Sequence, residues 1–105
     1  LRDGTQLLVY NHTNRRGPFP SGRNMLNLAT SRNGRDWTAS LLLERDKGEY
    51  SYPAVIQDRA GRVHITYTWR RQRVRHVVID PRRLEGRPIR DRRWPDGVAR
   101  LAAGR

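Results

Sequence analysis

The stretch TSRNGRDWTAS, residues 30–40, decides the predicted fold. An Asn-Gly pair at residues 33 and 34 forms the tip of a polar turn, and Trp37 follows that turn directly. Asn-Gly between two apolar runs is a strong hairpin signal, because glycine accepts the positive φ that a tight turn requires. A side-chain oxygen at residue 33 can accept N–H bonds of the turn, and the indole can cover the hairpin base. We therefore expect Trp37 to stabilise a hairpin, which is a role in folding and not in chemistry.

Short strand-like segments recur on both sides of this turn. Each is rich in Val, Ile, Leu, Tyr, Thr and Trp and is bounded by Gly, Asp, Asn or Pro. We expect strands at residues 5–12, 24–31, 37–44, 50–57, 62–69 and 73–80. No window has a convincing helical period. Because the links are hairpin-like, the strands should form two antiparallel sets of three, at residues 5–44 and 50–80.

Composition limits the core and bears on the choice of partners. Only 35% of the 105 residues are hydrophobic and the mean hydropathy is -0.92, so we expect a neighbouring part of the protein or a second copy of the chain to complete the core. The formal net charge of +12 makes nucleic acid an alternative partner. The arginines are scattered, however, and the aromatic platform of a single-strand binder is missing, so nucleic acid is the less favoured partner.

Several classes of site are excluded by what the sequence lacks. Without cysteine there is no disulfide framework and no cysteine-based zinc site. No apolar run approaches the roughly 20 residues of a membrane-spanning helix, so no membrane partner is expected. His12, His64 and His76 lack metal-ligand spacing, and we interpret them as structural or surface residues. We expect neither a metal nor a cofactor.

The two ends of the sequence carry separate expectations. The opening LRDGTQLLVY is typical of entry into a strand, and it has neither an initiator Met nor a signal peptide. We expect the natural N-terminus to lie elsewhere. Residues 85–105 have no strand or helix period, and we expect an irregular C-terminal tail.

The turn SRNGRDW resembles the Asp-box, Ser-x-Asp-x-Gly-x-Thr-Trp, which recurs in the blades of the sialidase superfamily. Asn33 takes the place of the Asp, Asp36 takes that of the Thr, and the spacing is one residue shorter. In this family the motif marks the fold and lies away from the active site. The expected Asp-box residues are Ser31, Asn33, Gly34, Asp36 and Trp37.

Two further stretches agree with the family in order. SGRNMLNLATSRNGRDW places an Arg at the start of the strand before the box, and GEYSYPAVIQDRAGRVHITYTW resembles the family's Tyr-Ser-x-x-Ala stretch with the aromatic strand after it. The resemblance covers residues 3–84. It implies an all-β chain of two consecutive antiparallel blades, one or both incomplete, of a six-bladed β-propeller of the sialidase type. Residues 1–84 would be the C-terminal two blades of a bacterial protein that is secreted or periplasmic.

The resemblance also implies roles for individual residues. In sialidases a triad of arginines binds the substrate carboxylate, and Arg23 would be the third of them. Its guanidinium would donate two parallel hydrogen bonds to the carboxylate, which a Lys cannot reproduce. Tyr50 would be the nucleophile, since sialidases use Tyr where most glycosidases use a carboxylate. Apart from the resemblance, Asn11 lies at the entrance of a long loop, where it is a candidate for contact with the sugar or for a role in the turn. Tyr50 and Tyr52 lie two residues apart on one strand face, so either is a candidate for the site or for the core.

The sequence departs from the family in what it lacks. The acid/base Asp, the activating Glu and the first two arginines would belong to other blades, and Thr66 or Thr68 replaces a Glu expected late in the aromatic strand. We therefore expect a C-terminal part of a sialidase-like glycoside hydrolase that acts on an anionic terminal sugar, inactive by itself. The alternatives are a non-catalytic carbohydrate-binding or scaffold propeller and a basic nucleic-acid-binding β domain.

Overall fold

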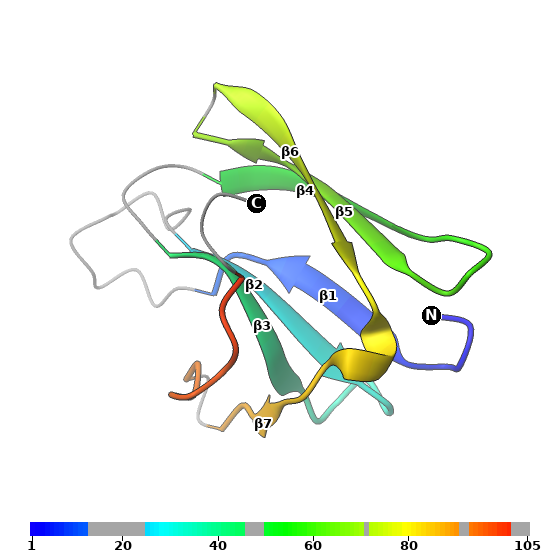
Figure 1. Ribbon diagram of the computed structural model, residues 1–105. Coiled ribbons are helices and arrows are strands. Elements are labelled where there is room, and N and C mark those ends of the chain that lie inside the picture. The colour runs from blue at the N-terminus through cyan, green and yellow to red at the C-terminus, as the bar shows by residue number, and fades with distance from the viewer. Residues whose placement is uncertain (13–24, 46–49, 71, 91–92, 102–105) are drawn as a thin grey trace.

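The structure, a computed structural model, describes residues 1–12, 25–45, 50–70, 72–90 and 93–101. Within these ranges the chain forms strands and one short helix of the 3-10 type, whose arrangement can be followed in Figure 1. The elements are β1 (Gln6–Tyr10), β2 (Met25–Ser31), β3 (Thr38–Arg45), β4 (Tyr50–Gln57), β5 (Val63–Trp69), β6 (Arg73–Ile79), η1 (Pro81–Arg83) and β7 (Arg87–Pro88). All six predicted strands are confirmed. In the described part of the chain no helix is long and apolar enough to cross a membrane.

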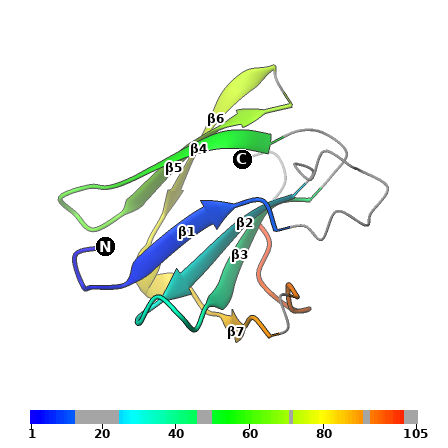
Figure 2. The same cartoon turned by 180° about the vertical axis from the view of Figure 1, so that it is seen from behind.

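The strands form two antiparallel sheets, with the orders β1-β2-β3-β7 and β4-β5-β6. This confirms the two predicted sets of neighbours. Figures 1 and 2 show the first sheet below and the second above, with the chain crossing from β6 through η1 to the far edge of the lower sheet. The sheets do not close into a ring, and their arrangement is compatible with propeller blades.

The fourth strand of the lower sheet is a feature that the sequence did not indicate. β7 pairs with the start of β3, where Thr38 faces Pro88 and Ala39 faces Arg87. Further along the same edge, the amide of Leu42 donates to the carbonyl of Ala99 at 2.8 Å. A strand of two residues that contains a proline is too short to show an alternation of apolar and polar residues. It is recognised only by its pairing with the neighbouring strand. The division into two blades and an irregular tail stays a prediction.

The core lies between the two sheets and follows the period-2 pattern of their strands. The lower sheet contributes Val9, Leu26, Leu28 and Leu43, and the upper sheet contributes Tyr50, Val63, Ile65, Tyr67 and Val77. These side chains are at most 9% exposed. Their burial removes apolar area from water, which is the main favourable contribution to packing one sheet on the other.

Register shifts on β3 and β4 turn side chains to another face of the sheet, and β3 has two of them, at Ser40 and at Leu43. On β3, Leu42 faces Asn27 and Glu44 faces Leu26, so Leu43 is an extra residue. A bulge of this kind breaks the alternation of the strand and turns the following side chain to the other face. Glu44 thereby joins Leu26 on the core side of the sheet.

The register shift on β4 corrects the expectation that the side chains of Tyr50 and Tyr52 lie on one face of the strand. Ser51 faces Thr68 and Ala54 faces Thr66, so β4 has one residue more than its partner. Tyr52 adopts a φ of 52°, which is unusual for an aromatic residue. As a result Tyr50 is fully buried whereas Tyr52 is 76% exposed. The two tyrosines therefore occupy different environments.

The hairpin turn has the expected Asp-box interactions. The Ser31 Oγ accepts the amide of Gly34 at 2.8 Å, and Asn33 Oδ1 accepts the amides of Arg35 and Asp36, each at 2.8 Å. Asn33 Nδ2 donates to the Asp36 carboxylate at 2.8 Å, and Gly34 has a φ of 76°. The asparagine therefore replaces the family's aspartate without loss of the acceptor oxygen.

Trp37 connects this turn to the segment after β7. Its side chain is half-buried, and its carbonyl accepts the amide of Ile89 at 2.9 Å. That its indole covers the hairpin base stays a prediction.

We expect Asn33→Ala to lower the free energy of unfolding by about 1–2 kcal/mol, because two turn amides lose their acceptor. Denaturant unfolding of the chain measures this change. Arg35→Ala is the matched control, since that side chain is exposed in the same turn and its amide bond to Asn33 is kept. Equal effects of the two substitutions would contradict the role of the Asn33 oxygen.

Candidate functional site

Tyr50 lies in a group of polar side chains at one end of the two sheets, which we call the tyrosine cluster. Its members come from the end of β3, the start of β4, the end of β5 and β6 with the turn before it. They are Glu44, Tyr50, Tyr67, Arg70 and Arg75. The hairpins of both sheets bring these strand ends together, so residues far apart in sequence become neighbours.

Glu44 is the acidic centre of the tyrosine cluster. Its side chain is 8% exposed, and its Oε1 accepts from Arg75 Nη1 at 2.6 Å. The same oxygen accepts the hydroxyl of Tyr67 at 2.8 Å. A buried carboxylate requires such partners, because leaving water costs an unpaired charge several kcal/mol. The charge of Glu44 is therefore neutralised locally.

Tyr67 acts in this cluster as a hydrogen-bond donor. Burial raises the pKa of its phenol well above the ordinary value, and the bond to Glu44 raises the pKa further. Both effects favour the neutral form, since a phenolate beside a carboxylate would be repelled. The Tyr67 hydroxyl is thus protonated under ordinary conditions and is unsuited to act as a nucleophile.

Tyr50 has a different partner. Its hydroxyl oxygen accepts from Arg70 Nε at 3.4 Å, and its side chain is fully buried among the described residues. The pairing therefore distinguishes the two buried tyrosines, because Tyr67 faces a carboxylate and Tyr50 faces an arginine.

Positive charge continues over the neighbouring surface. The guanidinium carbons of Arg70 and Arg73 lie 4.7 and 4.4 Å from the ring centroid of Trp69. Cations within about 6 Å of an indole face are attracted by the ring quadrupole. The indole therefore holds two arginines beside Tyr50, which gives this end of the molecule a chemistry suited to anions.

Asn11 lies beside the cluster and connects the two sheets. Its Nδ2 donates to the carbonyls of Met25 at 2.6 Å and Tyr50 at 2.9 Å. Both donors of the amide are thus used on backbone atoms. Its contact with a sugar stays a prediction, and the structure adds a bridging role between β2 and β4.

The predicted partner of Tyr50 is not part of this geometry. Arg23 lies outside the described residues, so its convergence with Tyr50 stays a prediction. Thr66 and Thr68 occupy the strand where the family has a Glu that steadies an arginine. In this chain Glu44, from β3, pairs with an arginine at the same end of the sheets.

Sequence reasoning missed Glu44, Tyr67, Arg70 and Arg75. Strict alternation along residues 41–44 would direct the Glu44 side chain away from the core. The bulge at Leu43 reverses that direction. Tyr67 was readable as an inward residue because it follows Val63 and Ile65 at period 2. Nothing in the sequence indicates that its partner is a carboxylate from the other sheet.

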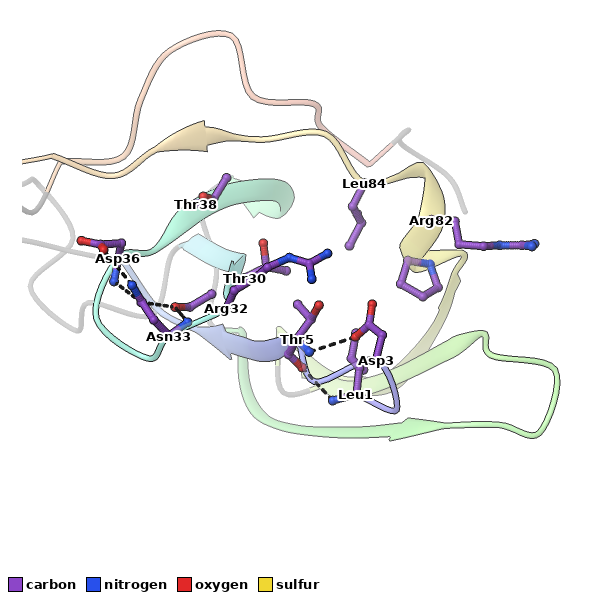
Figure 3. Close-up of a pocket in the computed structure, with 12 residues that line it drawn as sticks. Leu1, Asp3, Thr5, Thr30, Arg32, Asn33, Asp36, Thr38, Arg82 and Leu84 are labelled. Carbon is purple, nitrogen blue, oxygen red and sulfur yellow. Dashed lines mark hydrogen bonds between the residues drawn. The ribbon is translucent and has the colours of Figure 1, made fainter.

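A cavity lined by described residues lies at the opposite end of the strands. It encloses about 670 Å³ and is shown in Figure 3, with Asn33, Asp36 and Thr38 on one side and Arg82 and Leu84 on the other. Several of its polar groups are already used within the Asp-box turn. The tyrosine cluster, in contrast, places the phenol of Tyr50, the tyrosine that the sequence singled out, in contact with the guanidinium of Arg70. Within the described ranges no group of three or more His, Cys, Asp or Glu is placed to hold a metal ion.

Comparison with known proteins agrees with the fold and with the turn. The BNR repeat-like domain matches residues 1–65, a range that includes β1 to β4, the Asp-box turn and Tyr50. No curated protein and no solved structure matches the chain. The matched range is more than half of the 105 residues and holds both features that the sequence singled out. The chain therefore belongs to the BNR repeat-like domain family.

Proposed function

We propose that this chain supplies the nucleophile and a carboxylate-binding arginine to a sialidase-like glycoside hydrolase. Tyr50 is the proposed nucleophile and Arg23 the proposed ligand for the acidic group of the sugar. Two findings support the proposal: the match to the BNR repeat-like domain and the intact Asp-box geometry. The order of the Asp-box and the Tyr-Ser stretch along the chain agrees with it.

The observation that carries the proposal is the contact of the Tyr50 hydroxyl with Arg70 Nε at 3.4 Å. Attack on the anomeric carbon by the phenol oxygen would break the glycosidic bond and form a covalent glycosyl-tyrosine. The activating carboxylate of another blade would take the phenol proton, and the acid/base group would protonate the departing oxygen. Water would then hydrolyse the glycosyl-tyrosine and restore the phenol. A neutral phenol can approach an acidic sugar without the repulsion that a carboxylate would meet.

The proposed substrate is a terminal sugar with a carboxylate, such as a sialoside or a uronic-acid glycoside. The arginines beside Trp69 provide a positive surface next to Tyr50. The acid/base group, the activating carboxylate and two more arginines would come from further blades, so these two sheets alone should be inactive. Catalytic residues that act together lose most of their rate enhancement when some of them are missing.

A second candidate function has its own support. Tyr50 is fully buried among the described residues, and a nucleophile must reach its substrate. A propeller that binds an anionic sugar without cleaving it would use the same arginines and would need no exposed phenol. Both functions predict binding of the anionic sugar, and only the hydrolase predicts that the sugar is cleaved.

The two functions separate in a glycosidase assay on the protein in which these sheets are joined to their remaining blades. We expect turnover of fluorogenic α-sialosides or β-glucuronides and none of the neutral β-galactoside, with the 105-residue chain inactive in parallel. Binding of the acidic sugar without release of the fluorophore would replace the hydrolase with the binding function. Neither turnover nor binding would overturn both.

A further inference from the structure

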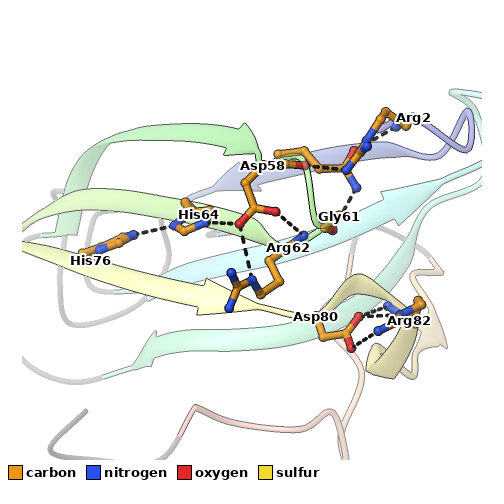
Figure 4. Close-up of polar contacts among 9 residues, drawn as sticks. Arg2, Asp58, Gly61, Arg62, His64, His76, Asp80 and Arg82 are labelled. Carbon is orange, nitrogen blue, oxygen red and sulfur yellow. Dashed lines mark hydrogen bonds and ion pairs between the residues drawn. The ribbon is translucent and has the colours of Figure 1, made fainter.

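His64 and His76 form a close pair on the outer face of the upper sheet (Figure 4). Their rings stack at 5.2 Å between centroids, and His64 Nδ1 lies 3.0 Å from His76 Nε2. The two residues are on adjacent strands, β5 and β6, where Thr66 faces His76 and Val78 faces His64. The diagonal placement across the strands brings together two imidazoles that lie 12 residues apart in sequence.

Asp58 holds the other side of this pair. His64 Nε2 donates to Asp58 Oδ2 at 2.8 Å, while Asp58 Oδ1 accepts the amide of Arg62 at 2.9 Å. An aspartate carboxylate is ionised at neutral pH, and the amide of Arg62 fixes this one within the turn. The carboxylate keeps the His64 proton on Nε2 and leaves the lone pair of Nδ1 directed at His76.

This arrangement has the chemistry of a metal-binding pair. Imidazole nitrogens are preferred ligands of zinc, copper and nickel ions. A histidine ligand commonly donates its second N–H to a carboxylate, which orients the ring and raises its basicity. Two nitrogens bound to one tetrahedral zinc are about 3.4 Å apart, from bonds of about 2.0–2.1 Å. The observed 3.0 Å separation has to widen only slightly to admit such an ion.

The surroundings permit access and limit the strength of the site. His64 is 25% exposed at its side chain, and His76 is exposed. Arg62 lies close by, with its Nε 3.3 Å from Asp58 Oδ2, and repels a cation. The Asp58 carboxylate offsets that repulsion. Only two protein ligands are present, so water would complete the coordination.

We propose that His64 and His76 bind a divalent transition-metal ion, with His64 Nδ1 and His76 Nε2 as ligands and Asp58 as the group that orients His64. On binding, the His76 proton moves from Nε2 to Nδ1, so both rings stay neutral and no electron is transferred. The site is independent of the tyrosine cluster and of the hydrolase proposal. It differs from the sequence-based expectation, because linear spacing cannot reveal a pair formed across two strands.

The test is a Zn²⁺ titration of the 105-residue chain, followed by competition with a chromophoric chelator. We expect one equivalent to bind and His76→Gln to abolish that binding. Asp58→Asn should weaken it by about 10–100-fold, as the loss of an orienting carboxylate does elsewhere. His12→Gln is the matched control, because His12 lies at the other end of the sheets beside Tyr10, and it should bind as the unaltered chain does.

Imidazole nitrogen NMR tests the geometry directly. Zn²⁺ should shift His64 Nδ1 and His76 Nε2 and leave His64 Nε2 protonated. Circular dichroism of each variant, recorded with a chelator present, establishes that the variant is folded. If His76→Gln does not fold, Asp58→Asn still tests the site, because it keeps both histidine ligands. Unchanged ring shifts, or binding that survives in His76→Gln or is lost in His12→Gln, would overturn the proposal.

Discussion

Replacement of Arg75 by Met is expected to lower the free energy of unfolding by about 3–5 kcal/mol, because it leaves the buried charge of Glu44 without its cation. The Glu44 side chain is 8% exposed, and Arg75 Nη1 lies 2.6 Å from its Oε1. The hydroxyl of Tyr67 would remain as its partner, and one neutral donor does not replace an ion pair. Denaturant unfolding measures the loss.

Two control variants separate this effect from simple loss of an arginine. Arg73→Met removes an exposed guanidinium from the same strand and should cost no more than about 1 kcal/mol. Adding Glu44→Gln to Arg75→Met should recover a large part of the stability, since the orphaned charge is then absent. Similar losses for Arg73→Met and Arg75→Met would mean that Glu44 is solvated and that the cluster contributes little.

Tyr50→Phe is expected to reduce turnover by about a thousandfold or more in the protein that carries the remaining blades, with a smaller change in affinity for the acidic sugar. The substitution removes only the oxygen that Arg70 contacts and keeps the buried ring. Kinetics with a fluorogenic sialoside, alongside direct binding of the free sugar, separate turnover from affinity.

Tyr52→Phe is the matched control for this result. It removes the same hydroxyl two residues away, from a side chain that is 76% exposed. Turnover should stay near that of the unaltered protein. If Tyr52→Phe removed activity and Tyr50→Phe did not, Tyr52 would be the nucleophile and the role of the buried tyrosine would be structural.

The local features of this protein were readable from sequence. The six main strands and their order follow from alternating apolar residues bounded by turn formers. The Asp-box turn follows from Asn33 and Gly34, because its hydrogen bonds join residues that are at most three apart. Interactions within a few residues depend on side-chain chemistry and backbone preference alone, which the sequence states directly.

The bulges on β3 and β4 were decided by pairing between strands. The extra residue Leu43 in β3 turned Glu44 toward the core, and the extra residue in β4 placed Tyr50 and Tyr52 in opposite environments. Alternation within one strand cannot reveal such a shift, because the shift is defined by the partner strand. The face of each tyrosine was therefore settled only in three dimensions.

The polar groups of greatest chemical interest depend on contacts across strands and sheets. Glu44 meets Arg75 from the other sheet, and His64 meets His76 from the neighbouring strand. By itself the sequence determined which segments become strands, where the turns lie and which family the chain resembles. Tertiary structure alone decided which charges, phenols and imidazoles meet, because sheet register and sheet packing set those distances and neither is encoded in the spacing along one strand.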